Sequence, residues 1–179
     1  IANNIVDNGR GFARSKIFKH KHEDYTGRTS SITQYYVNHN DKVIGFFDLA
    51  GHEKYLKTTM SGLTGSMIDY GMMTIGGDRG VIGMTKEHMS MAIGLNIPFF
   101  FIVTKIDIAP KDKIEIILDK VAKIMGTNAA GKKKTIVIKD DSNISVLENW
   151  TNNKICPIFL ISNKTGYNLI NLRNFIYSL

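Results

Sequence analysis

The sequence contains very little cysteine and no long apolar run. Cys156 is its only cysteine, so the chain cannot form an internal disulfide, which fits a reducing compartment. The longest apolar run, Ile97 to Val103, has the length of a strand, whereas a membrane-spanning helix needs about 18 apolar residues. The first residues are rich in Asn and Gly and lack the apolar core of a secretory signal. We therefore expect a cytoplasmic protein that does not associate with membranes.

The 179 residues, 43% hydrophobic and 22% charged, have the length and composition of one soluble domain. The net charge of +7 is unevenly distributed. Basic residues gather near the N-terminus, at Arg10, Arg14, Lys16, Lys19, Lys21 and Arg28, and again at Lys132, Lys133 and Lys134. Such clusters attract polyanions, including nucleotide phosphates, RNA and ribosomes; an ordinary solvated surface is the alternative, above all for the lysine triplet.

Apolar strand-like segments alternate with longer segments of helical period, which predicts an α/β fold with a mostly parallel sheet flanked by helices. Strands are expected at residues 43–47, 70–75, 97–103, 135–138 and 158–161, with 97–103 as the buried central strand. Helices are expected at residues 52–63, 85–95, 112–125 and 169–179. Two polar segments, 128–134 and 140–153, are interpreted as surface insertions within a single domain, residues 1–179.

The segment Asp48-Leu49-Ala50-Gly51-His52 joins the first expected strand to the first expected helix. A carboxylate at a strand end, such as that of Asp48, can hold Mg²⁺ directly or through water. Gly51 allows a backbone N–H to approach a phosphate, which the N-terminus of the following helix also favours. The alternative interpretation is an ordinary strand–turn–helix corner with a capping aspartate.

A second motif, Thr104-Lys105-Ile106-Asp107, follows the strand expected at 97–103. A carboxylate such as that of Asp107 accepts two N–H donors from one edge of guanine, and adenine offers no matching pair. The stem of Lys105 can lie along the face of the base. Taken alone, this tetrapeptide also fits a solvated Lys-Asp pair after a strand.

A third motif, Ser162-Asn163-Lys164, follows the strand expected at 158–161. A tight turn here would direct backbone N–H groups at the guanine carbonyl oxygen, although the motif by itself is a weak signal. The three motifs occur in order, each at a strand end. We therefore expect one nucleotide site at the carboxyl edge of the sheet, where open α/β sheets bind ligands.

These motifs resemble those of the GTPase domain of translational GTPases, whose signatures include Asp-x-x-Gly-His, Asn-Lys-x-Asp and Ser-Ala-x. Over essentially all 179 residues, the chain is most similar to the eukaryotic subfamily of GTP-binding proteins 1 and 2. The segments that carry this similarity are 7–11, 20–23, 27–31, 48–59, 85–88, 156–157 and 161–163. The resemblance implies a P-loop NTPase fold, the cofactors GTP or GDP and Mg²⁺, and GTP hydrolysis that serves as a switch in translation or RNA metabolism. RNA or the ribosome would then be a partner of the basic N-terminal region.

The resemblance also implies roles for individual residues. Thr29, in the first switch region (residues 1–31), would bind Mg²⁺ through its hydroxyl when a γ-phosphate is present. Asp48 would hold that metal through water, and the N–H of Gly51 would contact the γ-phosphate. His52 would be the catalytic residue, because it occupies the position that orients the attacking water.

At the other end of the nucleotide, Lys105 and Asp107 would bind guanine, and the turn that begins at Ser162 would close over the base. Two residues depart from the family pattern. Thr104 replaces the usual asparagine, which shortens or removes a link between base-binding loops. Asn163 replaces the usual alanine, which is tolerable if only its backbone contacts the base.

The phosphate-binding sequence Gly-x-x-x-x-Gly-Lys-Ser/Thr does not occur in the 179 residues. The family would place it, with the first strand, just before Ile1, so we expect a GTPase domain that lacks this strand and loop. We predict that the chain alone binds GTP weakly or not at all and is inactive, although its full-length parent hydrolyses GTP. The alternative is a nucleotide-independent remnant of a GTPase fold that binds RNA or a protein. Asp107 argues against an ATP-using P-loop enzyme.

Other histidines and the cysteine offer weaker possibilities. His20, His22 and Cys156 lack the spacing of a zinc cluster. His88, on an expected helix, is interpreted as a packing residue rather than a catalytic one.

Overall fold

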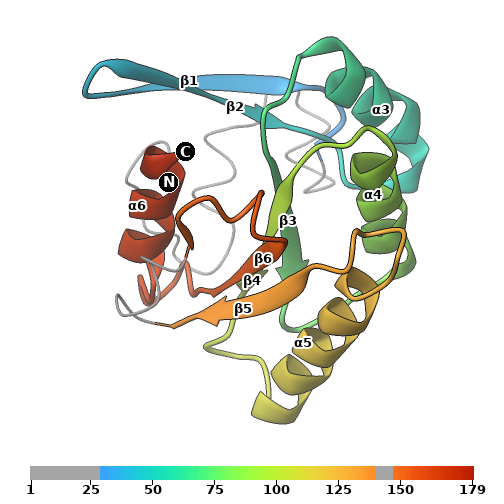
Figure 1. Ribbon diagram of the computed structural model, residues 1–179, viewed down its shortest axis with the longest axis vertical. Coiled ribbons are helices and arrows are strands. Elements are labelled where there is room, and N and C mark those ends of the chain that lie inside the picture. Colours follow the sequence, from blue (N-terminus) through green and yellow to red (C-terminus); the bar gives the residue numbers. More distant parts are fainter. Residues whose placement is uncertain (1–28, 140–146) are drawn as a thin grey trace. The chain divides into compact units, whose positions relative to one another are not determined.

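The computed structural model describes residues 29–139 and 147–179. The chain divides into two compact units, one ending at Ile68 and the other running from Asp69 to Ser178 (Figure 1). The basic residues at 10–28, most of the expected first switch region and residues 140–146 of the second insertion lie outside the described residues. Among the helices of the described residues, none has the length and apolar character needed to cross a membrane.

The first unit contains a hairpin of two antiparallel strands, β1 (Thr33–His39) and β2 (Lys42–Asp48). Asn40 begins the two-residue connection with a positive φ of 50°, a conformation that asparagine adopts more readily than most residues. The sequence prediction placed the strand that ends at Asp48 in the large parallel sheet. The structure corrects this, because β2 pairs with β1 in a sheet of its own.

The hairpin is followed by the 3-10 helix η1 (Glu53–Tyr55) and by α3 (Leu56–Gly65), where the sequence predicts a single helix. Gly62 allows α3 to pack tightly, because a Cβ atom there would lie 2.6 Å from Leu49 Cδ2 and 3.1 Å from Ile32 Cδ1. The buried Thr59 hydroxyl donates to the carbonyl oxygen of Ala50 at 2.5 Å. The loop after Asp48 is therefore fixed to α3 by packing and by a hydrogen bond.

The second unit is built on a parallel four-stranded sheet in the order β3 (Gly71–Gly76), β4 (Phe99–Thr104), β6 (Ile155–Leu160), β5 (Lys134–Ile138). Strand β4 lies inside the sheet, and its first five residues are buried. The prediction of a buried central strand is therefore confirmed, because residues covered on both faces of a sheet read as a continuous apolar run.

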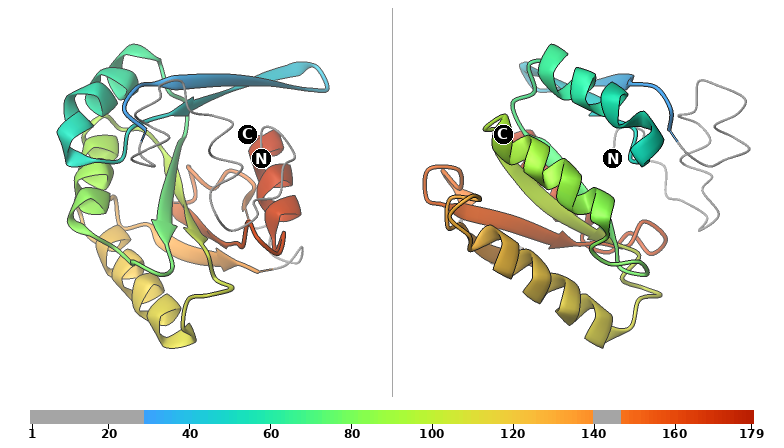
Figure 2. Two further views of the ribbon diagram at one scale, coloured as in Figure 1. Left: turned by 180° about the vertical axis from the view of Figure 1, so that it is seen from behind. Right: turned by 90° about the vertical axis from the view of Figure 1, so that its right-hand side faces the viewer.

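Three helices cover this sheet: α4 (Gly83–Gly94), α5 (Lys111–Met125) and α6 (Leu169–Ser178). Figure 2 shows α4 and α5 on one face and α6 on the other. Under α6, Phe100, Phe159 and Phe175 form an aromatic cluster with ring centroids 5.0–6.1 Å apart. Trp150 joins this cluster and is only 4% exposed, so the second expected insertion contributes to the core as well as to the surface.

Candidate functional site

The loop after β4 carries the Thr104–Asp107 motif and turns sharply. Lys105 has a positive φ of 60°, and its carbonyl oxygen accepts hydrogen bonds from the N–H groups of Ile108 and Ala109, each at 3.2 Å. This turn brings the exposed Asp107 to the carboxyl edge of the sheet while Ala109 is buried beneath it. Asp107 is thus on an exposed but hydrogen-bonded turn.

The second and third motifs meet at this edge. Strands β4 and β6 are neighbours in the sheet, so the loops that follow them lie together. The Ser162 hydroxyl donates to Oδ1 of Asp107 at 2.6 Å, and Ser162 is only 1% exposed. The two motifs share one edge of the sheet, as expected, and a direct hydrogen bond joins them. The sequence alone did not show this bond.

Ser162 also accepts two hydrogen bonds from the turn that follows it. Its hydroxyl oxygen accepts from the Thr165 N–H at 3.2 Å, and its carbonyl oxygen accepts from the Gly166 N–H at 2.9 Å. Gly166 has a φ of 78°, which glycine adopts without strain. The tight turn expected here is present, with Asn163 and Lys164 exposed at its tip.

Lys105 forms an ion pair that sequence analysis missed. Its Nζ lies 2.9 Å from Oδ2 of Asp78, in the loop after β3. This hydrogen bond is the main reason that the pKa of the Asp78 carboxyl is lowered. Lys113 also donates to the backbone carbonyl of Asp78. The sequence shows only a Gly-Gly-Asp-Arg-Gly loop, with no signal of its partner.

Gly77 lets this loop approach β4 closely. A Cβ atom on Gly77 would lie 2.9 Å from the carbonyl oxygen of Thr104 and 2.9 Å from Cβ of Ala109. The Gly77 N–H donates to the same Thr104 oxygen at 2.9 Å. The Thr104 side chain has its own partner, the carbonyl oxygen of Ile75, at 3.5 Å. Thr104 therefore links β4 to β3 and to the loop that follows β3.

In the first unit, Thr29 and Asp48 lie side by side. The Thr29 hydroxyl is 3.3 Å from Oδ2 of Asp48, and Thr29 is 6% exposed. Asp48 is the last residue of β2 and pairs with Thr33 in the hairpin. No group of three or more His, Cys, Asp or Glu side chains that could hold a metal occurs among residues 29–139 and 147–179. A hydroxyl beside one carboxylate nevertheless fits Mg²⁺, which usually takes one or two carboxylates and completes its shell with water and phosphate.

His52 follows Gly51 and caps η1. Its Nδ1 accepts the Lys54 N–H at 3.2 Å, so a neutral ring carries its proton on Nε2. The ring also makes an edge contact with Tyr55, at a centroid distance of 6.3 Å. Gly51 is exposed, and a Cβ atom there would meet nothing within 4 Å. The imidazole orientation is therefore set by the start of the helix, beside an open backbone.

The sequence model of the elongation factor Tu GTP-binding domain matches residues 2–179. The chain belongs to this family. It is a GTP-binding domain of the elongation-factor type, and the parallel sheet with its flanking helices is the α/β fold of P-loop NTPases. The resemblance drawn from the motifs is confirmed.

Individual relatives support this assignment. The chain is 40% identical over 196 residues to GTP-binding protein 1 of Xenopus laevis, covering 96% of the chain and 30% of that protein. It is 33% identical over 193 residues to human GTP-binding protein 2, covering 96% of the chain and 32% of that protein. The 179-residue chain thus spans about a third of the length of these two relatives.

Solved structures agree on the fold. Translation elongation factor SelB from Methanococcus maripaludis, in complex with the GTP analogue GppNHp, superposes with a TM-score of 0.65. The sequences are 20% identical, and the match covers 97% of this chain and 31% of that one. At this identity the similarity establishes the fold alone.

Proposed function

We propose that this GTP-binding domain works in a longer protein that hydrolyses GTP as a switch in translation or RNA metabolism. The observation that carries the proposal is the 2.6 Å hydrogen bond between Ser162 and Asp107. A buried serine fixes a carboxylate at the carboxyl edge of the sheet, which is where open α/β sheets bind ligands.

Guanine recognition would depend on Asp107. Guanine presents two N–H donors on one edge, and a carboxylate accepts both. Hydrogen bonds to a charged group contribute about 1.5–3 kcal/mol each, so a base without these donors is strongly disfavoured. Oδ1 is held by Ser162, while Oδ2 accepts no hydrogen bond from the described part of the chain. The exposed Asn163 and Lys164 would close over the base, and the stem of Lys105 would cover its face.

Residues of the first unit would bind Mg²⁺ and the γ-phosphate. Thr29 and Asp48 have the oxygen ligands that suit Mg²⁺, a metal that stabilises charge on the transferred phosphoryl group. The N–H of Gly51 would bind the γ-phosphate, because Gly51 is exposed and a Cβ atom there would meet nothing within 4 Å. Loss of the γ-phosphate would release Thr29 and Gly51, which is how such switches change state.

His52 would act as the catalytic residue by orienting the attacking water. Its Nδ1 accepts from Lys54, so the neutral ring presents Nε2–H to water, and the water then donates elsewhere. Catalysis of this kind works by positioning rather than by proton abstraction.

The His52→Ala variant of the full-length protein tests this role. We expect the turnover number for GTP to fall by about 10²-fold or more, as for loss of a positioning group, while GTP affinity stays nearly constant. Glu53→Ala, at the neighbouring exposed position, is the matched control and should hydrolyse GTP normally. Unchanged hydrolysis in His52→Ala would remove His52 from the mechanism.

Residues 1–179 contain no Walker sequence, and backbone amides and a lysine of that type are the main contacts to the phosphates. We therefore propose that the 179-residue chain alone binds GTP weakly or not at all. A partnership with RNA or the ribosome through the basic residues at 10–28 is part of the same proposal, because polyanions are attracted to such clusters.

A further inference from the structure

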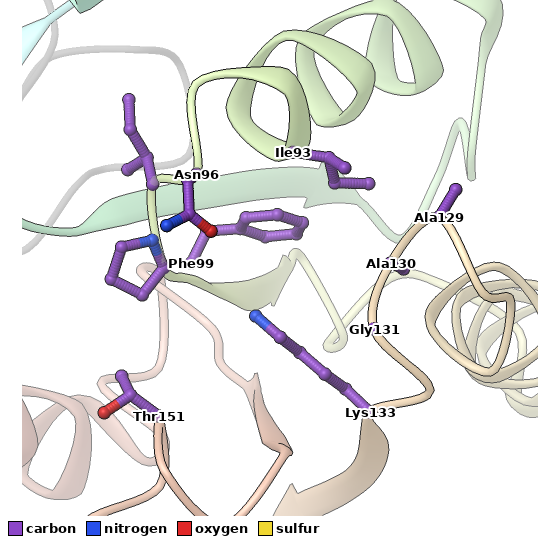
Figure 3. A pocket seen from close by; sticks show the side chains of 10 residues that line it. Ile93, Asn96, Phe99, Ala129, Ala130, Gly131, Lys133 and Thr151 are labelled. Atoms are coloured by element: carbon purple, nitrogen blue, oxygen red, sulfur yellow. The ribbon is translucent and has the colours of Figure 1, made fainter.

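A pocket with a volume of about 390 Å³ opens at the amino edge of the four-stranded sheet (Figure 3). Its apolar wall includes Ile93, Ile97 and Phe99, and its polar side chains are Asn96, Lys133 and Thr151. This volume lies within the roughly 300–1,000 Å³ that small-molecule sites occupy. The pocket therefore has the size and the mixed lining of a ligand site.

Lys133 is the residue that gives the pocket its chemistry. Its backbone is anchored, because its N–H donates to the carbonyl oxygen of Met125, the last residue of α5, at 2.8 Å. Its half-buried side chain extends from the position just before β5 toward Phe99, with Nζ 5.6 Å from the ring centroid (Figure 3). The ammonium group is therefore held against the apolar wall.

Among the residues that the structure describes, no carboxylate pairs with the positive charge of Lys133. No Asp or Glu side chain is among the residues that line the pocket. In the part of the chain that the structure describes, Lys133 makes no ion pair, and the neighbouring Lys132 and Lys134 add two further positive charges. A half-buried cation without a carboxylate partner favours an anion in the adjacent space.

We propose that this pocket binds a small amphipathic anion: an organic acid or acid ester with one anionic group and a compact apolar body. The anionic group pairs with Lys133, and the apolar body lies against Ile93 and Pro98, the lining residues that leave more apolar surface accessible than the buried Phe99 and Ile97. The side-chain amide of Asn96 and the hydroxyl of Thr151 supply hydrogen bonds to the anionic group or to a polar substituent on the body.

This site is separate from the guanine-binding residues within the same unit. Residues at the amino ends of β4, β5 and β6 line the pocket, whereas Asp107 and Ser162 follow the carboxyl ends of β4 and β6. Strand β4 has six residues, and a strand rises about 3.3 Å per residue, so the two sites are roughly 20 Å apart. A ligand in the pocket does not occupy the guanine site, and binding at each can be measured independently.

The test uses a pair of fluorescent probes with the 179-residue chain. Anilinonaphthalenesulfonate is an aromatic anion, and phenylnaphthylamine has the same aromatic body without the sulfonate. We expect saturable binding of the anion, and a dissociation constant that rises about fivefold or more in Lys133→Met, which keeps the apolar stem and loses the charge. Binding of the uncharged probe should be the same in both proteins.

Two control variants test whether the loss of anion affinity comes from the charge of Lys133 in the pocket. Lys132→Met removes an equal charge from the exposed neighbour that does not line the pocket, and should leave both affinities unchanged. Lys133→Arg keeps the charge and should retain most of the anion affinity. On addition of the anion to the ¹⁵N-labelled chain, the amide shifts of Asn96, Gly131 and Thr151 should change most.

Several results would overturn the proposal. They are an absence of saturable anion binding, an equal loss of both probes in Lys133→Met, an equal weakening by Lys132→Met, or shift changes centred on residues far from the pocket. A dispersed ¹H–¹⁵N spectrum of Lys133→Met, like that of the unmodified chain, shows that the variant is folded, so a selective loss of the anion cannot then be attributed to unfolding.

Discussion

The Ser162→Ala substitution isolates the hydrogen bond on which guanine recognition is proposed to depend. The hydroxyl donates to Asp107 at 2.6 Å and accepts from the Thr165 N–H at 3.2 Å, and Ser162 is 1% exposed. A hydrogen bond to a charged group is worth about 1.5–3 kcal/mol. Because Asp107 is exposed, water replaces part of the lost interaction, so we expect a loss near the lower end of this range. A loss of about 1.4 kcal/mol corresponds to a tenfold weaker affinity.

The assay is equilibrium titration of the full-length protein with GDP and GTP. We expect about a tenfold increase in both dissociation constants, because the base is common to both nucleotides. Ser90→Ala, the same change at an exposed position of α4 that has no proposed role, is the matched control and should bind as the unmodified protein does. Unchanged affinity in Ser162→Ala, or equal weakening in Ser90→Ala, would refute the argument that Ser162 positions Asp107.

Two further predictions concern the second unit. Gly77→Ala places a Cβ atom 2.9 Å from the Thr104 carbonyl oxygen, so the free energy of unfolding should fall by about 1–3 kcal/mol in a denaturant titration. Gly83→Ala, where a Cβ atom meets nothing within 4 Å, should not be destabilising; equal effects would contradict the packing argument. Burial raises the pKa of the Cys156 thiol to about 12. This thiol therefore contributes its full share to the free energy of unfolding below about pH 9. That contribution is lost as the pH rises from 9 to 12, because the thiol ionises first in the unfolded chain. Thiol reagents at pH 8 should modify Cys156 only upon unfolding, and rapid modification of the folded chain would contradict its burial.

The inner strands of the second unit's sheet, β4 and β6, were predictable because they are almost entirely buried. The apolar run at 97–103 has no polar residue, so its place inside a parallel sheet followed from the sequence. The proximity of Asp107 and Ser162 followed from the rule that loops after neighbouring parallel strands lie at the same edge of the sheet. The role of Ser162 was less visible, since a turn motif does not reveal which atom its hydroxyl binds.

Other features could not be predicted from the sequence. Strand β1 alternates exposed with less exposed residues and contains polar side chains, so no apolar run marks it. The error of placing β2 in the large sheet followed from missing its partner. Asp78 is brought to Lys105 by the fold, since 27 residues separate them in sequence. Trp150 lies in a polar segment, and its burial depends on aromatic rings from distant strands and α6.

The central claim is that Asp107 selects guanine, and Asp107→Asn in the full-length protein tests it most directly. Xanthine has a carbonyl oxygen where guanine has its amino group, so an asparagine amide can donate to it while a carboxylate is repelled. We expect this variant to lose GTP affinity by about 10²-fold and to gain affinity for xanthosine triphosphate. Glu115→Gln, an equal charge change on the exposed surface of α5, should alter neither affinity. If Asp107→Asn binds GTP as tightly as before, Asp107 does not bind the base.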